Sequence, residues 1–354
     1  MTRPGALLIS HAAGVTPAAQ TRREQALLEG AALGELHLHV STLGGTVLGL
    51  GAFHQQPRPA PTMTAEATWR RRGGGCAVAC GTGFVVLTLG LPHRAALVAG
   101  EAAALRPEQV MNRCVRGPLE WLRHGGLDPI YPGLDTITVA RRVLARLGFA
   151  ETEQGPTVFQ AILAWDGSFA DTPALLDRLD PDGRVPMRLV ARSETTSLAE
   201  LGRERGRPVD VASVARGLAA AYAAAFPAAI GAIDEIDPAV TALLETPEGV
   251  AGVEESPPPE LPAAPVVEHG LLGQVAAAAR VEAGRVAAFT LTGDFLAPEW
   301  AVRELGARIE GGAATADAAR TAADAVLDGS RGYLLGLAPD ALRRLLGRAL
   351  TEAA

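Results

Sequence analysis

The chain has 354 residues, of which 48% are hydrophobic and 20% charged, and its formal net charge is −7 at pH 7. This balance is typical of a folded globular protein, and the length favours two domains over one. The acidic net charge argues against nonspecific nucleic-acid binding, and no apolar run reaches the roughly 18 residues that a membrane span needs.

The reactive residue types set further limits on the chemistry. All 32 basic residues are arginine, because the sequence contains no lysine, so no mechanism here uses a lysine amine of this chain. Three cysteines, an odd number, are typical of reduced thiols in the cytoplasm. The opening residues hold too short an apolar stretch for a signal peptide, so we expect a cytoplasmic location.

Helices and strands alternate through the first two thirds of the chain. Apolar periodicity predicts helices at residues 16–33, 106–126 and, after a capped loop, within 195–226. Apolar, β-branched or alternating runs predict strands at residues 36–42, 45–55, 83–92, 135–145 and 157–166. Several adjacent strands mixed with helices favour an α+β fold class, and residues 1–228 form the first expected domain.

The composition changes near residue 229. Residues 229–268 are rich in proline and acidic residues and have little periodicity, which favours a semi-rigid interdomain linker. Residues 269–354 then resume a folded pattern. They predict two strands joined at Glu282-Ala283-Gly284, followed by three helices, as a small accessory domain.

The segment "WRRRGGGCAVACGTG" at residues 69–83 carries the most specific chemical signal. Three glycines in series let backbone N–H groups approach a ligand closely, and guanidinium groups beside them favour an anion. A strand follows the glycines where a helix would be needed, so neither a P-loop nor a dinucleotide-binding fingerprint is present. The alternative is a solvated arginine face beside a glycine turn.

The order of these segments resembles the lipoate–protein ligase family. Arg70-Arg71 before Gly73-Gly74-Gly75, and then Gly81-Thr82-Gly83, look like that family's lipoate-binding stretch. "TVLGLGAFHQQ" and "YPGLDTITV" are similar to the segments that flank it, and "GDF" at 293–295 resembles a signature of the accessory domain. The resemblance implies a biotin/lipoate ligase-like mixed β-sheet domain with flanking helices, plus a small C-terminal α+β accessory domain.

The resemblance also implies an activity with its ligands and partner. ATP, Mg²⁺ and a medium-chain acid, lipoate or octanoate, would form an acyl-adenylate that a lysine of a lipoyl-carrier domain attacks. An apolar tunnel between the sheet and the glycine segment would take the acyl tail. The expected acid and adenylate contacts are Arg70, Arg71, Arg72, Gly73, Gly74, Gly75, Gly81, Gly83 and His54, with Asp135 at the magnesium and nucleotide.

The sequence departs from the family where chemistry is expected. Arg142 stands in the segment that resembles the one with the family's catalytic lysine, and an arginine is bulkier and forked. Cys80 best matches the family's histidine, and Arg72 replaces a hydroxyl residue. We therefore expect Arg142 and Cys80 to be the catalytic candidates, and we expect anion binding with slow adenylate formation.

Alternatives stay open for each of these residues. Cys80 is either a thioester-forming nucleophile of an octanoyl or lipoyl transferase, or a small buried residue. Arg142 and Asp135 are either ligand contacts or a surface arginine and a turn-capping aspartate. Cys76 and Cys80 form a poor zinc pattern. A third possibility is a non-catalytic protein that keeps only the acyl-binding or carrier-docking surface.

Overall fold

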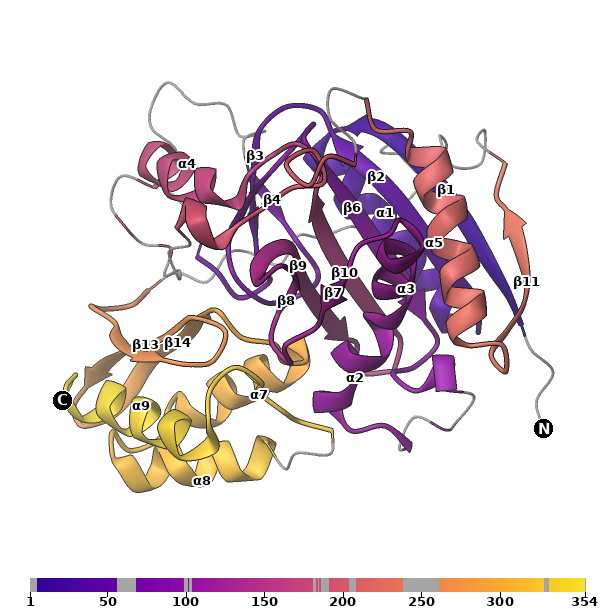
Figure 1. The fold of residues 1–354 in the computed structure, drawn as a ribbon. Coiled ribbons are helices and arrows are strands. Elements are labelled where there is room, and N and C mark those ends of the chain that lie inside the picture. The colour runs from indigo at the N-terminus through magenta and orange to yellow at the C-terminus, as the bar shows by residue number, and fades with distance from the viewer. Residues whose placement is uncertain are drawn as a thin grey trace.

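A computed structural model describes residues 5–55, 68–98, 101, 104–180, 183, 185, 191–203, 208–237, 261–327 and 331–353. Its largest feature is an eight-stranded mixed sheet with the strand order β11-β1-β2-β6-β10-β9-β8-β7 (Figure 1). The strands are β1 (Gly5–Val15), β2 (Leu36–Leu43), β6 (Phe84–Leu91), β7 (Pro129–Ile130), β8 (Thr136–Val139), β9 (Arg142–Glu151), β10 (Thr157–Ala164) and β11 (Ile230–Glu235). Strand β1 runs parallel to β2 and to β11, and the remaining pairs are antiparallel.

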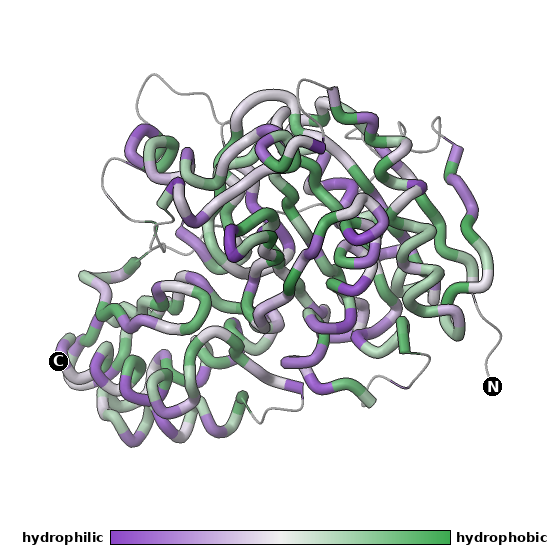
Figure 2. Tube along the Cα trace, viewed as in Figure 1, coloured by the Kyte–Doolittle hydropathy of each residue, from purple (hydrophilic) through white to green (hydrophobic). Residues whose placement is uncertain are grey.

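Helices cover this sheet on both faces. Helix α1 (Pro17–Ala32) packs on β2, β6 and β10, and helices α2 (Pro107–Cys114), α3 (Arg116–His124) and α5 (Val211–Ala225) lie on the opposite face. Every residue of β2, β6 and β10 is buried, and β6 and β10 are accordingly largely apolar on both sides, whereas β2 places His37, His39 and Ser41 on one side. Figure 2 shows apolar residues gathered along these central strands.

A small second sheet lies over the face that α1 covers. It has the order β4-β3-β5 and consists of β3 (Val47–Leu50), β4 (Thr68–Arg70) and β5 (Val78–Cys80). Its inner side packs against the main sheet through a cluster that includes Trp69, Val78 and Ile162. Its outer side packs against α4 (Thr172–Leu179). The glycine segment, defined as residues 73–75, connects β4 to β5.

The accessory domain has its own hydrophobic core. Strands β12 (Val266–His269), β13 (Gln274–Glu282) and β14 (Arg285–Gly293) form an antiparallel sheet, and helices α7 (Glu299–Ile309), α8 (Ala316–Val326) and α9 (Pro339–Thr351) cover it. The turn between β13 and β14 falls at Ala283-Gly284, both with positive φ. In Figure 1 this domain, orange to yellow, lies beside the lower end of the main sheet.

The structure differs from the sequence expectation in three places. Residues 135–145 form not one strand but a hairpin, with Ala140 and Arg141 at φ +48° and +65° in its turn. Residues 106–126 form two helices that meet at Val115. The expected linker begins with β11, which pairs with β1, and ends with β12; its residues 238–260 lie outside the described part. No helix in the described ranges has the length and apolar character to span a membrane.

Close packing between α3 and α5 depends on a glycine. A Cβ added at Gly117 of α3 would lie 2.5 Å from the Tyr222 ring of α5, whereas one added at Gly306 of α7 would meet nothing within 4 Å. We expect Gly117→Ala to lower the free energy of unfolding by about 1–3 kcal/mol through overpacking. The control Gly306→Ala should raise it by about 0.5–1 kcal/mol, the difference in helix propensity. Urea denaturation checks both, and equal effects would contradict the packing argument.

Candidate functional site

The glycine segment is buried, and protein groups accept from all three of its backbone N–H groups. Gly73 N–H donates to the Gln160 side chain at 2.8 Å, and Gly74 N–H donates to the Phe149 carbonyl at 3.4 Å. Gly75 N–H donates to the carbonyl of Phe295 in the accessory domain at 3.0 Å. A Cβ on Gly74 would lie 2.3 Å from that same carbonyl oxygen, so the close approach that requires glycine here is between two domains.

The three consecutive arginines before the glycines point to three different environments. Arg70 Nη1 donates to the carbonyls of Ala52 at 3.1 Å and of His54 at 2.6 Å. Arg72 Nη2 donates to the Gln25 side chain at 3.0 Å on the surface of α1. Arg71 is 1% exposed, and its Nη2 donates to the Cys76 carbonyl. Within the described residues, Nε and Nη1 of Arg71 have no hydrogen-bond partner.

Asp135 lies in the same buried cluster, held by two donors. Arg146 Nη1 lies 3.2 Å from both Asp135 carboxylate oxygens, and Cys76 Sγ lies 3.2 Å from Oδ2. Burial acts to lower the pKa of Arg146, but Cys76, Asp135 and Asp294 raise it overall, so the guanidinium stays charged. Arg146 Nε, like two nitrogens of Arg71, has no partner in the described part of the chain.

Arg142 does not join this cluster. It begins β9 beside the hairpin turn, its side chain is 36% exposed, and its Nη1 lies 3.4 Å from Glu200. Four residues of strand, or about 13 Å, separate it from Arg146. Arg146, which the sequence analysis did not single out, is the buried cation that pairs with Asp135. The signal was available, because Arg146-Leu147-Gly148 places a basic residue two positions before a glycine.

Cys80 is enclosed on β5 and is 1% exposed. Its Sγ lies 3.5 Å from the Val47 carbonyl, and burial raises the pKa of its thiol to about 12. A thiol with this pKa is almost entirely protonated at neutral pH, whereas the thiolate is the nucleophile. Gly81 and Gly83 lie in the turn after β5, and the Gly83 carbonyl accepts from the backbone N–H groups of residues 165–167. The hydrogen-bond partners of this turn are therefore different from those of the glycine segment.

His54 connects the glycine segment to the accessory domain. Its Nε2 lies 3.1 Å from the Gly75 carbonyl and 3.1 Å from Asp294 Oδ1, and both side chains are fully buried. Next to it the rings of Phe53 and Phe295 stack with centroids 4.5 Å apart. The expected site residue His54 and the expected signature at 293–295 thus meet at one interdomain contact.

A buried polar network lies on the other side of the glycine segment, beneath α1. Glu24 is fully buried and accepts from Arg72 N–H at 3.0 Å and from Gln160 Nε2 at 2.8 Å, with Gln20 Nε2 at 3.4 Å. Burial raises the pKa of Glu24 to about 7, and these hydrogen bonds act in the opposite direction. No sequence signal set Glu24 apart from the other charged residues of its helix.

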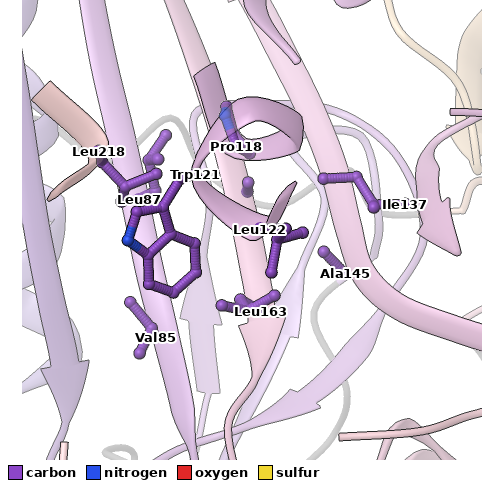
Figure 3. Close-up of a pocket in the computed structure, with 10 residues that line it drawn as sticks. Val85, Leu87, Pro118, Trp121, Leu122, Ile137, Ala145, Leu163 and Leu218 are labelled. Atoms are coloured by element: carbon purple, nitrogen blue, oxygen red, sulfur yellow. The ribbon is translucent and has the colours of Figure 1, made fainter. Parts of the chain in front are cut away.

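Two cavities lie away from the glycine segment. Figure 3 shows an apolar one of about 20 Å³, enclosed by residues that include Val85, Ala161, Leu163 and Trp121. Ala161 and Leu163 face the side of β10 opposite to Gln160, so this cavity is on the far face of the sheet from the glycine segment. A polar cleft of about 360 Å³ lies beside α7. The space where we expected an acyl tunnel is filled by the cluster around Trp69.

The residues around Asp135 do not fit a resident Mg²⁺ in this conformation. The place beside its carboxylate is taken by the Arg146 guanidinium, and Asp135 is 2% exposed. In the described ranges no three His, Cys, Asp or Glu side chains gather as metal ligands. The role expected for Asp135 at magnesium therefore stays a prediction.

The mixed sheet, its two helical layers and the small accessory domain define the fold of the biotin and lipoate protein ligases. The P. falciparum protein LipL1, solved in complex with lipoate, superposes with a TM-score of 0.64 over 98% of this chain and 99% of its own, at 13% identity. This confirms the expected α+β ligase-like fold.

Two further solved structures are similar over a smaller share of this chain. A bi-partite lipoate protein ligase of Thermoplasma acidophilum, solved with its E2 lipoyl domain, matches 69% of this chain and 91% of its own at 13% identity and a TM-score of 0.49. A lipoate-protein ligase A bound with ATP matches 68% and 92% at 14% identity and a TM-score of 0.48. No protein-family model and no curated protein sequence matches the chain.

The structure predicts very different roles for the two arginines of β9. Arg146→Ala leaves Asp135 charged and buried without its cation, and should lower the free energy of unfolding by about 3–5 kcal/mol. Arg142→Ala removes an exposed ion pair, and should cost less than about 1 kcal/mol. Urea denaturation at pH 7 compares them. Equal losses would show that Asp135 does not depend on Arg146.

Glu24 should make stability depend on pH. Its pKa is raised from 4.5 to about 7, so the folded state holds the proton more tightly than the unfolded state. The stabilisation is complete below about pH 4.5 and is lost as the pH rises to about 7, by about 3 kcal/mol. Glu24→Gln does not titrate and should lack this slope, whereas Glu29→Gln on the exposed side of α1 should keep it. Unfolding free energies from pH 4.5 to 8 measure the slope, and an unchanged slope in Glu24→Gln refutes the assignment.

Proposed function

We propose that the chain is a lipoate–protein ligase-like protein that binds the carboxylate of an acyl acid beside the glycine segment. The observation that carries the proposal is the pair of buried guanidinium groups, Arg71 and Arg146, with N–H groups that no described residue accepts. A buried guanidinium with unused donors favours an anion, and a carboxylate fits its planar fork.

The remainder of the proposed reaction follows from the ligase resemblance. The acid, lipoate or octanoate in that family, attacks ATP to form an acyl-adenylate with release of pyrophosphate. A lysine amine of a lipoyl-carrier domain then displaces AMP to form the amide. In this chain the buried arginines hold the carboxylate and the charge that develops beside it. Arg146 is already paired with Asp135, so less of its charge is available to the ligand. We therefore expect adenylate formation to be slow.

One alternative has a specific observation in its favour. A non-catalytic acid-binding protein does not need the N–H groups of the glycine segment for a reacting ligand. In this structure the Gly75 N–H is already bound to the Phe295 carbonyl, as that alternative would have it. The thioester-forming transferase has no such support, because the Cys80 thiol is buried and its pKa is raised.

Calorimetric titration tests acid binding. Wild-type protein should bind lipoate or octanoate, and Arg71→Gln should weaken that binding by about 10-fold to 100-fold, the effect of a hydrogen bond to a charged group. Arg142→Gln, which changes an exposed arginine on β9, is the matched control and should change it less than about twofold. Equal effects of the two variants would refute the proposed head-group site.

Pyrophosphate release with ATP and Mg²⁺ separates the ligase from the non-catalytic protein. We expect slow release by the wild type that depends on the acid, and faster release by Arg146→Lys, because an ammonium is a compact charge. Arg142→Lys should resemble the wild type. Acid binding without release in any of the three would favour the non-catalytic protein.

A further inference from the structure

Trp69 lies on the same side of β4 as Arg71. The two residues are separated by one position on an extended segment, which continues past β4 because Arg71 N–H donates to the Leu50 carbonyl at 2.9 Å. Alternate residues of a strand face the same way, so both side chains enter the space between the small sheet and the main sheet. Each is 1% exposed.

The Trp69 indole lies in the hydrophobic cluster between the two sheets, on the side of the segment that Arg71 shares. Its neighbours in the cluster between the sheets include Val78, Cys80, Phe84 and Ile162. An octanoyl tail carries seven carbons beyond its carboxyl group. Trp69 is the largest side chain in this cluster, so it limits the room that these carbons would need between the sheets.

The indole also brings an unused donor into this apolar surrounding. Trp69 Nε1–H is buried and has no hydrogen-bond partner in the described ranges. Buried indole N–H groups normally find an acceptor, because an unpaired donor loses its bond to water. Together with Nε and Nη1 of Arg71, three unpaired donor nitrogens come from one strand segment.

We propose that Trp69 determines specificity for the acid. Its ring weakens the binding of a plain medium-chain tail, and its N–H donates to a second acceptor on the ligand, so the preferred acid is short and carries an oxygen a few atoms from its carboxylate. This inference rests on the proposed function, because it takes the Arg71 guanidinium as the carboxylate partner.

The experiment compares three acids on the full chain by calorimetric titration: pentanoate, 4-oxopentanoate and octanoate. Wild-type protein should bind 4-oxopentanoate about threefold to tenfold more tightly than pentanoate, the range of one neutral hydrogen bond. Trp69→Phe keeps a large ring but removes the N–H, and should abolish this preference. Trp69→Val opens room for the tail, and should bind octanoate at least tenfold more tightly than the wild type does.

The outcomes separate this inference from the function on which it rests. If Arg71→Gln weakens acid binding but both Trp69 variants bind the three acids as the wild type does, the inference is overturned and the head-group site stands. A wild type that prefers octanoate to 4-oxopentanoate also overturns it. If no acid binds, or if binding is insensitive to Arg71→Gln, the proposed function fails and the inference fails with it. Because Trp69→Phe is conservative in volume, loss of folding in Trp69→Val leaves the test of the N–H intact.

Discussion

The pairing of three buried glycine N–H groups is the constraint on which the site depends. An unpaired buried amide costs about as much as a lost hydrogen bond, so each glycine of residues 73–75 needs an acceptor. Gln160 of β10, Phe149 of β9 and Phe295 of the accessory domain supply these acceptors. The segment is therefore complete only when the accessory domain is docked, and the contacts of His54 and Phe53 at residues 293–295 hold that docking.

Strands β6 and β10 were predictable because burial on both faces leaves a nearly continuous apolar run, and β2 was predictable from its alternation of apolar and polar residues. The hairpin within residues 135–145 was not predictable, because its turn residues Ala140 and Arg141 adopt positive φ without glycine, asparagine or proline to signal a turn. Attention fell on Arg142 for another reason, because its segment resembles the one that holds the family's catalytic lysine. Likewise β11 joins the main sheet from a proline-rich stretch, because its partner β1 lies more than two hundred residues earlier in the chain.

The candidate segment could be singled out from the sequence, but its contacts could not. The arginine–glycine pattern marks the segment, and the histidine in "AFHQQ" lies beside it in the structure. Sequence alone gave three adjacent arginines one role, whereas strand alternation sends Arg70 to carbonyl groups and Arg71 to the interior. Partners such as Asp294 for His54, 240 positions apart in the chain, depend on the docking of two domains and leave no local trace in the sequence.

The absence of lysine changes what a buried carboxylate can be paired with. A lysine beside Asp135 would be a compact charge with rotatable donors, whereas the planar guanidinium of Arg146 contacts both carboxylate oxygens through Nη1. Its Nε then has no acceptor among the residues that the structure describes, and the same holds for two nitrogens of Arg71. Compensating one buried charge with arginine therefore leaves buried donors whose geometry is fixed by the fold. Such fixed donors favour selective anion binding, because the planar fork of a guanidinium matches the geometry of a carboxylate.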